Sequence, residues 1–477
     1  MFTFTIALLA LIAGYFFYGK FVEKIFGVDP ARKTPAYTKQ DGVDYIPMPT
    51  WKIFMIQFLN IAGLGPIFGA IMGAKFGTAS YLWIVLGSIF AGAVHDFLAG
   101  MISLRNGGES LPETIGRYLG VNFKQFMRGF TVLLMVLVGA VFVAGPAGLL
   151  AKLTPESLDL SFWATVVFVY YVLATLLPID KIIGKIYPIF AIALIFMAAG
   201  ILFMIFWHHP ALPELTDGIA NTHPDGLPIF PMMFISIACG AISGFHATQS
   251  PLMARCMRNE RESRSVFYGA MISESIIALV WAAIAMAFWG DVAGLNGAIA
   301  EYGGQAAVMI DVIANKTLGP VLAVFVIFGV VACAITSGDT AFRSARLIVA
   351  DFMGVEQRTL RKRIYICIPL FALGLLIIFG LPFQTMWSYF AWMNQTLAAV
   401  TLWMIVAYLR HRGRAVWVGL IPALVMTYVC ASYIFVSPLM LGMQNRTAAY
   451  LLGGGVTLAV LVAMIFKLKD NDAKGIS

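Results

Sequence analysis

Charged residues are scarce in this chain. Of its 477 residues only 12% are Asp, Glu, Lys or Arg, whereas 60% are hydrophobic and the mean hydropathy is +0.86. A water-soluble domain could not hide so much apolar surface inside its own core. The composition therefore excludes a soluble protein and predicts helices that use lipid as their solvent.

The motifs of several function classes are also missing. The five cysteines form no CxxC pair and have no zinc-like spacing, and no HExxH occurs. The glycine-rich segment 106–110 lacks the lysine of a phosphate-binding loop, and the Lys and Arg residues lie in short clusters rather than on one basic face. We therefore expect no disulfide, no metal, no cofactor, no nucleic-acid partner and no enzymatic activity. The first apolar run lacks a cleavage pattern and is expected to stay as a helix.

Apolar runs of about 20 residues recur along the chain and predict an all-α integral membrane protein. Thirteen transmembrane helices are expected, beginning near residues 4, 52, 80, 129, 162, 183, 229, 266, 319, 364, 385, 416 and 448. With residues 20–52 in the cytoplasm, 28 of the 32 Lys and Arg lie inside. This bias follows the positive-inside rule. It predicts a bacterial inner-membrane protein with an extracytoplasmic N-terminus and a cytoplasmic C-terminus.

Two of the predicted spans are interrupted by helix-breaking residues. The run from Asn60 to Pro66 contains two glycines and a proline, and the run from Cys239 to Pro251 combines glycines and a proline with polar side chains. Glycine is costly inside a helix and proline removes a backbone donor, so both helices are expected to break. Unpaired backbone at such a depth must face protein or a water-filled cavity. The alternative is that the glycines only allow close helix packing.

The two interrupted runs lie about 180 residues and five spans apart. An odd offset makes the second half cross the membrane in the opposite direction, which predicts two inverted five-helix repeats with a binding site at the broken helices. The expected units are an N-terminal helix and loop (1–50), the first repeat (51–207), an external loop (208–228), the second repeat (229–409), and two C-terminal helices with a tail (410–477).

A broken helix exposes free N–H groups and the positive end of a helix dipole, so an anion is the expected ligand. Gly63 and Gly65 at the first break, and His246 and Gln249 at the second, are the candidate substrate-binding residues. Pro66 suits the first position of a half-helix because its missing N–H would be unpaired there. A packing role is the alternative for His246.

Ionisable residues within the spans are costly enough to be functional candidates. His95 and Asp96 in the third span and Glu274 in the eighth occupy corresponding places in the two repeats. A His and a carboxylate held together could exchange a proton during transport, whereas a static polar clamp between helices is the alternative.

A hydroxyl-rich segment, 336–340, is expected at the cytoplasmic end of the span that begins near residue 319. Thr336 and Ser337, with carbonyls freed at the first break, would suit sodium, and Asp339 would suit a proton. Pairing of Asp339 with Arg343 or Arg346 is the alternative. The sequence leaves the coupling ion open.

Three strings resemble the carbon starvation protein A family of inner-membrane transporters: GAVHDF (92–97), CGAISGFHATQSP (239–251) and SGDTAFRSARL (337–347). The resemblance implies the amino-acid/polyamine/organocation superfamily with a LeuT-type five-plus-five repeat, and uptake of peptides or of pyruvate with protons. By motif it points to His95, Asp96, Gly240, Ser243, Gly244, His246, Asp339 and Arg343, and it adds Gly240, Ser243 and Gly244 to the candidate substrate-binding residues. The chain is much shorter than the better-known members, and its HATQSP and SGDTA strings differ from theirs in detail.

The expected function is that of a proton-coupled symporter that imports pyruvate or short peptides by alternating access. Its expected partners are a small anionic substrate and the lipid bilayer. A sodium-coupled amino-acid symporter and a nutrient sensor that binds without transport are the alternatives. An intramembrane metalloenzyme that uses His95, Asp96 and His246 is a further one.

Overall fold

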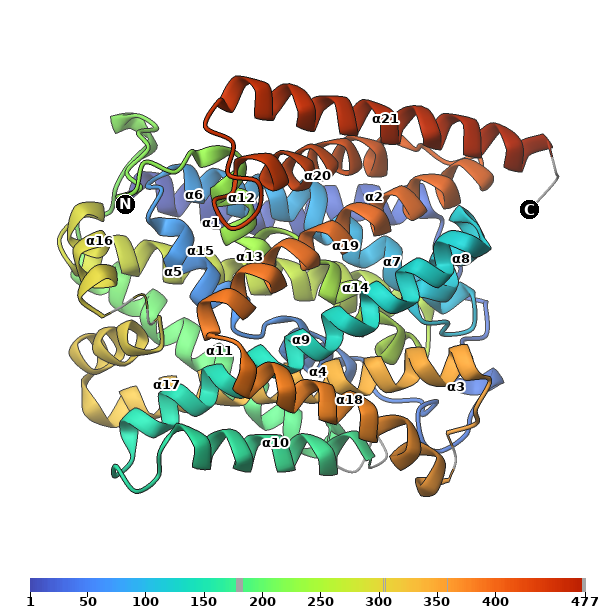
Figure 1. Ribbon diagram of the computed structural model, residues 1–477, viewed down its shortest axis with the longest axis horizontal. Coiled ribbons are helices and arrows are strands. Elements are labelled where there is room, and N and C mark those ends of the chain that lie inside the picture. The colour runs from blue at the N-terminus through green and yellow to red at the C-terminus, as the bar shows by residue number, and fades with distance from the viewer. Residues whose placement is uncertain (177–182, 303, 305, 358, 474–477) are drawn as a thin grey trace.

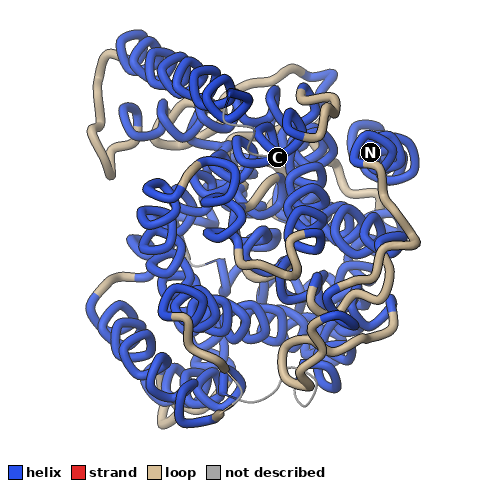
Figure 2. The backbone as a smooth tube through the Cα atoms, turned by 90° about the vertical axis from the view of Figure 1, so that its right-hand side faces the viewer, coloured by secondary structure: helices blue, strands red, loops and turns tan. Residues whose placement is uncertain are grey.

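The computed structural model describes residues 1–473 apart from 177–182, 303, 305 and 358. Within this part of the chain the fold is all-helical and contains no strand (Figure 2). In the first half the elements, with η marking 3-10 and π turns, are α1 (Phe2–Ala13), η1 (Gly14–Tyr18), α2 (Gly19–Phe26), α3 (Pro35–Thr38), α4 (Thr50–Ile61), η2 (Gly65–Gly69), α5 (Ala70–Ala74), α6 (Ala79–Leu82), η3 (Trp83–Gly92), α7 (Ala93–Arg105), α8 (Leu111–Leu119), α9 (Val121–Leu153), α10 (Leu160–Leu176) and α11 (Ile183–His208).

The second half begins after the loop that carries η4 (Leu215–Asp217). Its elements are η5 (Ile229–Met233), α12 (Phe234–Ser236), α13 (Ala238–Ala241), α14 (Gly244–Ala254), η6 (Glu260–Glu262), η7 (Arg264–Gly269), α15 (Ala270–Phe288), α16 (Val292–Glu301), α17 (Ala306–Met353), α18 (Leu360–Gly380), α19 (Phe383–His411), α20 (Trp417–Val436) and α21 (Arg446–Ala473). Figure 1 shows most of the long helices running side by side.

Ten helices of the described chain are long and apolar enough to cross a membrane, or eleven when the bent pair of α4 with η2 and α5 is one span. This makes the chain a multi-pass membrane protein. The count of thirteen stays a prediction. Helix α10 has only 17 residues, and the segment from η5 to α14 is broken into short pieces. Neither is a single helix long enough to be counted as a membrane span, although both lie where a span was expected.

The connections at one end of the helix bundle are rich in Lys and Arg. They are the segments 27–49, 106–120, 255–263, 354–363 and 410–416, and we call this end, on the right in Figure 1, the basic end. The N-terminus lies at the opposite end, where its amino group contacts the carboxylate of Glu214 in the loop between α11 and η5. Helix α21 starts at that opposite end, where Arg446 donates to the Gly226 carbonyl, and runs toward the basic end.

Helix α17 packs along α9 through the middle of the bundle. Close approach is possible because Gly139 has no side chain: a Cβ there would stand 2.4 Å from the Phe342 ring. The helix is interrupted at Gly319, whose φ is +78°, and is then continuous to Met353. The expectation that this span ends at residues 336–340 is therefore wrong, because the helix continues for more than three further turns.

The C-terminal helices are peripheral. Helix α21 packs mainly along α20 and lies on the upper edge of the bundle in Figure 1, and only 17% of its apolar stretch is buried. That the core ends near residue 409 stays a prediction. The division of that core into two inverted repeats stays a prediction.

Candidate functional site

The first interrupted run breaks a helix, as predicted. Helix α4 ends at Ile61, Ala62 leaves the helical conformation with ψ at +36°, and η2 begins at Gly65 with Pro66 in its first turn. The helix axis bends by 53° between the two pieces. Proline fits at this place because the first N–H groups of a helix have no partner within it.

The second interrupted run breaks a helix as well. Helix α13 ends at Ala241, Ile242 and Ser243 have extended backbones, and α14 begins at Gly244. A further interruption, at Ile237, separates α12 from α13. The prediction of a broken helix in each half is confirmed.

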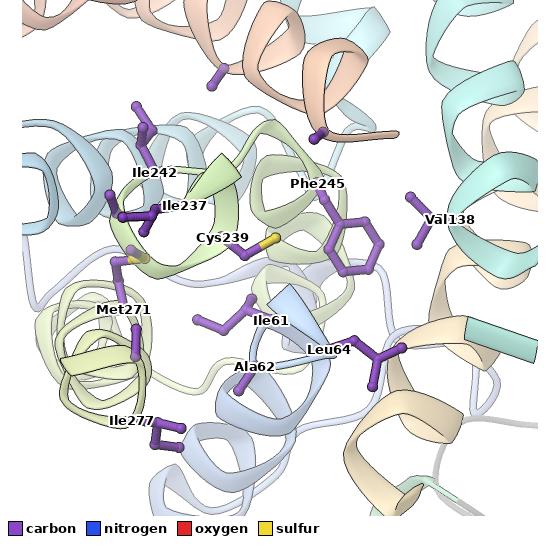
Figure 3. Packing of buried hydrophobic residues seen from close by; sticks show 14 of the residues in the cluster. Ile61, Ala62, Leu64, Val138, Ile237, Cys239, Ile242, Phe245, Met271 and Ile277 are labelled. Carbon is purple, nitrogen blue, oxygen red and sulfur yellow. The ribbon is translucent and has the colours of Figure 1, made fainter. Parts of the chain in front are cut away.

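The two breaks lie against each other. A Cβ built on Gly65 would stand 2.2 Å from Cys239 Cβ, and one built on Gly240 would stand 3.9 Å from Pro66 Cα. Figure 3 shows Ala62 and Leu64 from the first break beside Cys239 and Phe245 from the second. Gly65 and Gly240 therefore allow η2 and α13, the helical pieces beside the two breaks, to touch.

Side chains close the meeting point of the breaks. Leu64, Phe142 and Phe245 are each only 1% exposed, and the rings of Phe142 and Phe245 meet edge to face with their centroids 6.3 Å apart. A Cβ on Gly63 would stand 2.7 Å from the Phe142 ring. In this conformation the meeting point is closed to solvent.

The start of α14 is capped by a residue that the sequence analysis did not single out. Asn394 of α19 accepts hydrogen bonds at its Oδ1 from the Phe245 N–H at 2.7 Å and from the Ser243 hydroxyl at 3.1 Å. An amide that was expected to meet the substrate thus has a protein partner here. The neighbouring polar residues Asn394 and Gln395, both fully buried within an apolar helix, are the signal that could have revealed this contact.

Gln249 points away from the breaks. Its Nε2 donates to the Thr248 hydroxyl at 2.9 Å and to the Ser344 hydroxyl at 3.3 Å, so it links α14 to α17. It lies more than one turn beyond Gly244, which separates it from the glycines that form the break.

Four ionisable side chains form a continuous chain of contacts. His95 Nδ1 lies 2.7 Å from Asp96 Oδ1, and Asp96 Oδ2 lies 2.8 Å from His246 Nδ1. His246 Nε2 lies 3.3 Å from Glu274 Oε2. All four side chains are fully buried, and they come from α7, α14 and α15.

The chain joins residues that the sequence analysis assigned to different roles, because His246 stands between the carboxylates of Asp96 and Glu274. Imidazole can donate from both nitrogens only when both carry a proton. The ring can therefore hold a proton for either carboxylate or pass one between them. Such an arrangement can take up and release a proton inside the bundle without bulk water.

A second polar cluster lies at the first break. The Ser337 hydroxyl is 3.2 Å from the Leu59 carbonyl, 2.9 Å from the Asn60 carbonyl and 3.0 Å from the Cys333 carbonyl. Cys333 Sγ contacts the Ala62 carbonyl. One hydroxyl proton can satisfy only one of these carbonyls at a time, so the cluster has more acceptors than donors, as a site for a hard cation does.

The other residues of the hydroxyl-rich segment have different partners. The Thr336 hydroxyl donates to the Cys333 carbonyl of its own helix at 2.9 Å. Asp339, fully buried, accepts from the Tyr187 hydroxyl at 2.6 Å. Arg343 and Arg346, the alternative partners of Asp339, lie 3.9 and 3.6 Å from Asp44. Asp339 thus belongs to the contact of α17 with α11.

No three His, Cys, Asp or Glu side chains of the described residues gather around a point that could hold a metal ion. His95, Asp96, His246 and Glu274 are arranged in a line and do not surround a common centre. The geometry suits a proton relay better than a coordination sphere.

Comparison with known proteins gives a consistent result. The family model "Carbon starvation protein CstA" matches residues 1–158, 149–314 and 291–432. The chain is 28% identical to the peptide transporter CstA of Campylobacter jejuni, over 86% of this chain and 76% of that protein. It is 29% identical to the pyruvate/proton symporter BtsT of Escherichia coli, over 56% of this chain and 46% of that protein.

Two solved structures share the fold. The manganese transporter of Eremococcus coleocola aligns with a TM-score of 0.56 at 15% identity, covering 92% of this chain and 99% of that one. MhsT in complex with L-phenylalanine aligns with a TM-score of 0.55 at 14% identity, covering 87% and 98%. At such low identity these similarities concern the fold alone.

Proposed function

The chain belongs to the carbon starvation protein CstA family, and from this premise we propose that it is a secondary transporter for a small organic anion, either pyruvate or a short peptide, that works by alternating access. The relatives that are named as transporters of peptides and of pyruvate with protons support this assignment. We infer that the helices form two inverted repeats in the inner membrane with the basic end in the cytoplasm. No catalytic step is proposed.

The observation that carries the proposal is the contact of the two breaks at Gly65 and Cys239. Where two broken helices meet, amide groups of both can turn toward a bound carboxylate once the surrounding side chains move apart. Glycine at positions 63, 65, 240 and 244 keeps the backbone accessible to such a ligand. The closed arrangement around Leu64 and Phe245 corresponds to a state between the outward-open and inward-open forms.

The proposed coupling ion is the proton. The line from His95 to Glu274 runs through His246, only two residues beyond the start of α14. Protonation in this line changes the charge beside the anion site, so that the site attracts the substrate in one protonation state and releases it in the other. An empty carrier and a loaded carrier then prefer different conformations.

Sodium coupling is a second candidate, and one observation favours it. The carbonyls of Leu59, Asn60 and Cys333 surround the Ser337 hydroxyl at the first break. Sodium at this point would bridge α4 and α17, two elements that move relative to each other in an alternating-access cycle. The two ions thus have separate candidate sites, and mutations can address each site by itself.

Counterflow in proteoliposomes tests the proposal. Radiolabelled pyruvate is offered to vesicles loaded with unlabelled pyruvate, and small monocarboxylates, amino acids and dipeptides compete outside. Separate pH and sodium gradients then identify the driving ion. The proposal expects exchange that pyruvate or a dipeptide blocks and accumulation that follows the pH gradient. Accumulation that depends on sodium alone would show that sodium, and not the proton, is the coupling ion. Binding without flux would indicate a sensor.

A further inference from the structure

Two buried arginines on α17 lie near the basic end of the bundle. Arg343 and Arg346 are both fully buried. Arg343 is six residues beyond Ser337 on the same helix, which corresponds to about 9 Å along the axis. Burying a guanidinium group is costly unless an anion and hydrogen-bond acceptors compensate it. The partners of these arginines therefore decide what this region can bind.

The compensation at Arg346 is incomplete. Among the described residues, none of its three guanidinium nitrogens has a hydrogen-bond partner. Arg343, by contrast, donates to the Ala174 carbonyl at 2.5 Å. Arg363 of α18 adds a third guanidinium to the same region, where it donates to the Leu176 carbonyl. Arg346 therefore has donors to spare.

One carboxylate stands near both arginines without bonding to either. Asp44 Oδ1 is 3.6 Å from Arg346 Nη2 and 3.9 Å from Arg343 Nη1, and it accepts no hydrogen bond from a described residue. These distances are too long for hydrogen bonds. Asp339, a second described carboxylate within electrostatic reach, accepts from Tyr187. Among the described residues, Asp44 is thus the carboxylate that pairs with Arg346, and the pair is loosely held.

We call the segment 41–49, which carries Asp44 beside Arg343 and Arg346, the cover. It precedes α4, the helix that leads to the first break. Three contacts hold it: the Met48 N–H donates to the Cys256 carbonyl at 3.0 Å, the Tyr45 hydroxyl donates to the Gly107 carbonyl at 3.2 Å, and the Tyr45 ring lies 5.1 Å from the Arg255 guanidinium. Cys256, fully buried, lies beneath it with its Sγ 3.8 Å from the Asp44 carbonyl.

We propose that Arg343 and Arg346 form a carboxylate-binding subsite between the breaks and the basic end, occupied by Asp44 in this conformation and by the carboxylate of the solute after the segment moves away. The inference rests on the proposed transport of an organic anion. A guanidinium group binds a carboxylate best through two parallel, short hydrogen bonds. A free carboxylate can reach that geometry at Arg346, whereas Asp44 does not. The solute therefore displaces Asp44, and the cover moves away from the arginines.

Cys256 provides a reporter for the position of the cover. The parent is the unmodified chain, in which peptide mass spectrometry reads the modification of Cys256 separately from that of the other four cysteines, all of them buried. Purified in nanodiscs, it reacts with a soluble maleimide at a rate that reports exposure of Cys256. We expect pyruvate to accelerate this reaction about threefold or more, because displacing Asp44 uncovers the thiol.

Three variants distinguish binding at the subsite from a general destabilisation of the fold that would also expose Cys256. Asp44→Asn should label fast without pyruvate. Arg346→Gln should label fast as well and should not respond to pyruvate, while Arg346→Lys, which keeps the charge and loses the planar fork, should respond only at higher pyruvate concentrations. Glu356→Gln, which neutralises an exposed carboxylate of the same end, is the matched control and should label like the parent. Size-exclusion elution and the thermal midpoint show whether each variant is folded.

The outcomes distinguish this inference from the function on which it rests. An Arg346→Gln variant that responds to pyruvate as the parent does overturns the subsite, and so does an Asp44→Asn variant that labels at the parent rate. Counterflow of pyruvate without any effect on labelling overturns the subsite and leaves the transport function intact. Labelling that requires pyruvate and Arg346, in a protein without flux, supports the subsite and contradicts transport.

Discussion

Gly65 and Cys239 are in such close contact that a methyl group on the glycine would overlap the cysteine side chain, 2.2 Å away. The two residues belong to different halves of the chain and to the two broken helices. Their contact sets how closely η2 and α13 approach each other. Any transport cycle that opens a site between the breaks must begin from this contact.

Replacing Gly65 by alanine is expected to push the breaks apart. Overpacking of this kind typically costs about 1–3 kcal/mol, and we expect pyruvate counterflow to fall about tenfold or more. Thermal unfolding in detergent and counterflow measure the two effects. Gly148→Ala in α9 is the control, because a Cβ there meets nothing within 4 Å. Full activity of Gly65→Ala would show that the crossing is unimportant for transport.

Replacing Glu274 by glutamine is expected to uncouple transport from protons. The amide keeps the shape of the side chain but cannot accept a proton from His246, which lies 3.3 Å away. Accumulation driven by a pH gradient should fall to the level of simple exchange, while exchange itself persists. Ser273→Ala, which removes a hydroxyl bonded within the same helix, should retain accumulation. If Glu274→Gln still concentrates pyruvate along a pH gradient, the relay is not the coupling device.

Asn394 offers a test of the anion site itself. Asn394→Asp preserves the acceptor for the Phe245 N–H but places a negative charge at the start of α14, where the substrate carboxylate is expected. We expect the KM for the anion to rise about tenfold, which corresponds to about 1.4 kcal/mol, with little change in stability. Gln384→Glu adds the same charge at an exposed position of α19 and should leave the KM unchanged. An unaltered KM in Asn394→Asp would contradict an anion site at the start of α14.

The contact between Glu214 and the N-terminal amino group, at the end opposite the basic end, is expected to weaken in acid. Burial raises the pKa of the Glu214 carboxyl group, but hydrogen bonds from the N-terminal amino group and from Thr3 outweigh this and lower it from 4.5 to about 2. Because the pKa is lower in the folded state, the contact stabilises the protein above pH 4.5, and this contribution is lost as the pH falls from 4.5 toward 2.

The measurement is the thermal midpoint of Glu214→Gln relative to the unmodified chain between pH 7 and 3. The pair is partly exposed, so the difference at neutral pH should be below about 1 kcal/mol and should shrink on acidification. Glu156→Gln, at an exposed position without a described ion pair, is the control. A difference that grows toward low pH would contradict the assignment.

Local chemistry made the breaks predictable. Gly63, Gly65 and Pro66 are unfavourable in any continuous helix, so the place of the first break follows from residue type alone. The cost of burying charge likewise singles out His95, Asp96 and Glu274 as candidates. That His246 connects Asp96 to Glu274 could not be predicted, because the contact depends on how α7, α14 and α15 pack.

The wrong helix end and the missed contacts both concern residues that meet only in the folded chain. The segment 336–340 was expected at the cytoplasmic end of its span, with Arg343 and Arg346 as alternative partners of Asp339. Both arginines are buried within α17, which continues to Met353. Positive charge near a membrane surface is usually solvated, and the sequence contains no sign that Asp44, some 300 residues earlier, covers these two. Asn394 was missed because its cap on α14 is likewise a contact between distant elements.

The continuity of α17 has a mechanical consequence. From Ser337 at the first break to Arg346 under the cover, the chain is one uninterrupted stretch of helix, and hydrogen-bonded helices resist stretching along their axes. A tilt or rotation that begins at the proposed ion site would therefore be carried along this helix to the guanidinium groups. Release of the ion and displacement of Asp44 would then be coupled through one movement of α17.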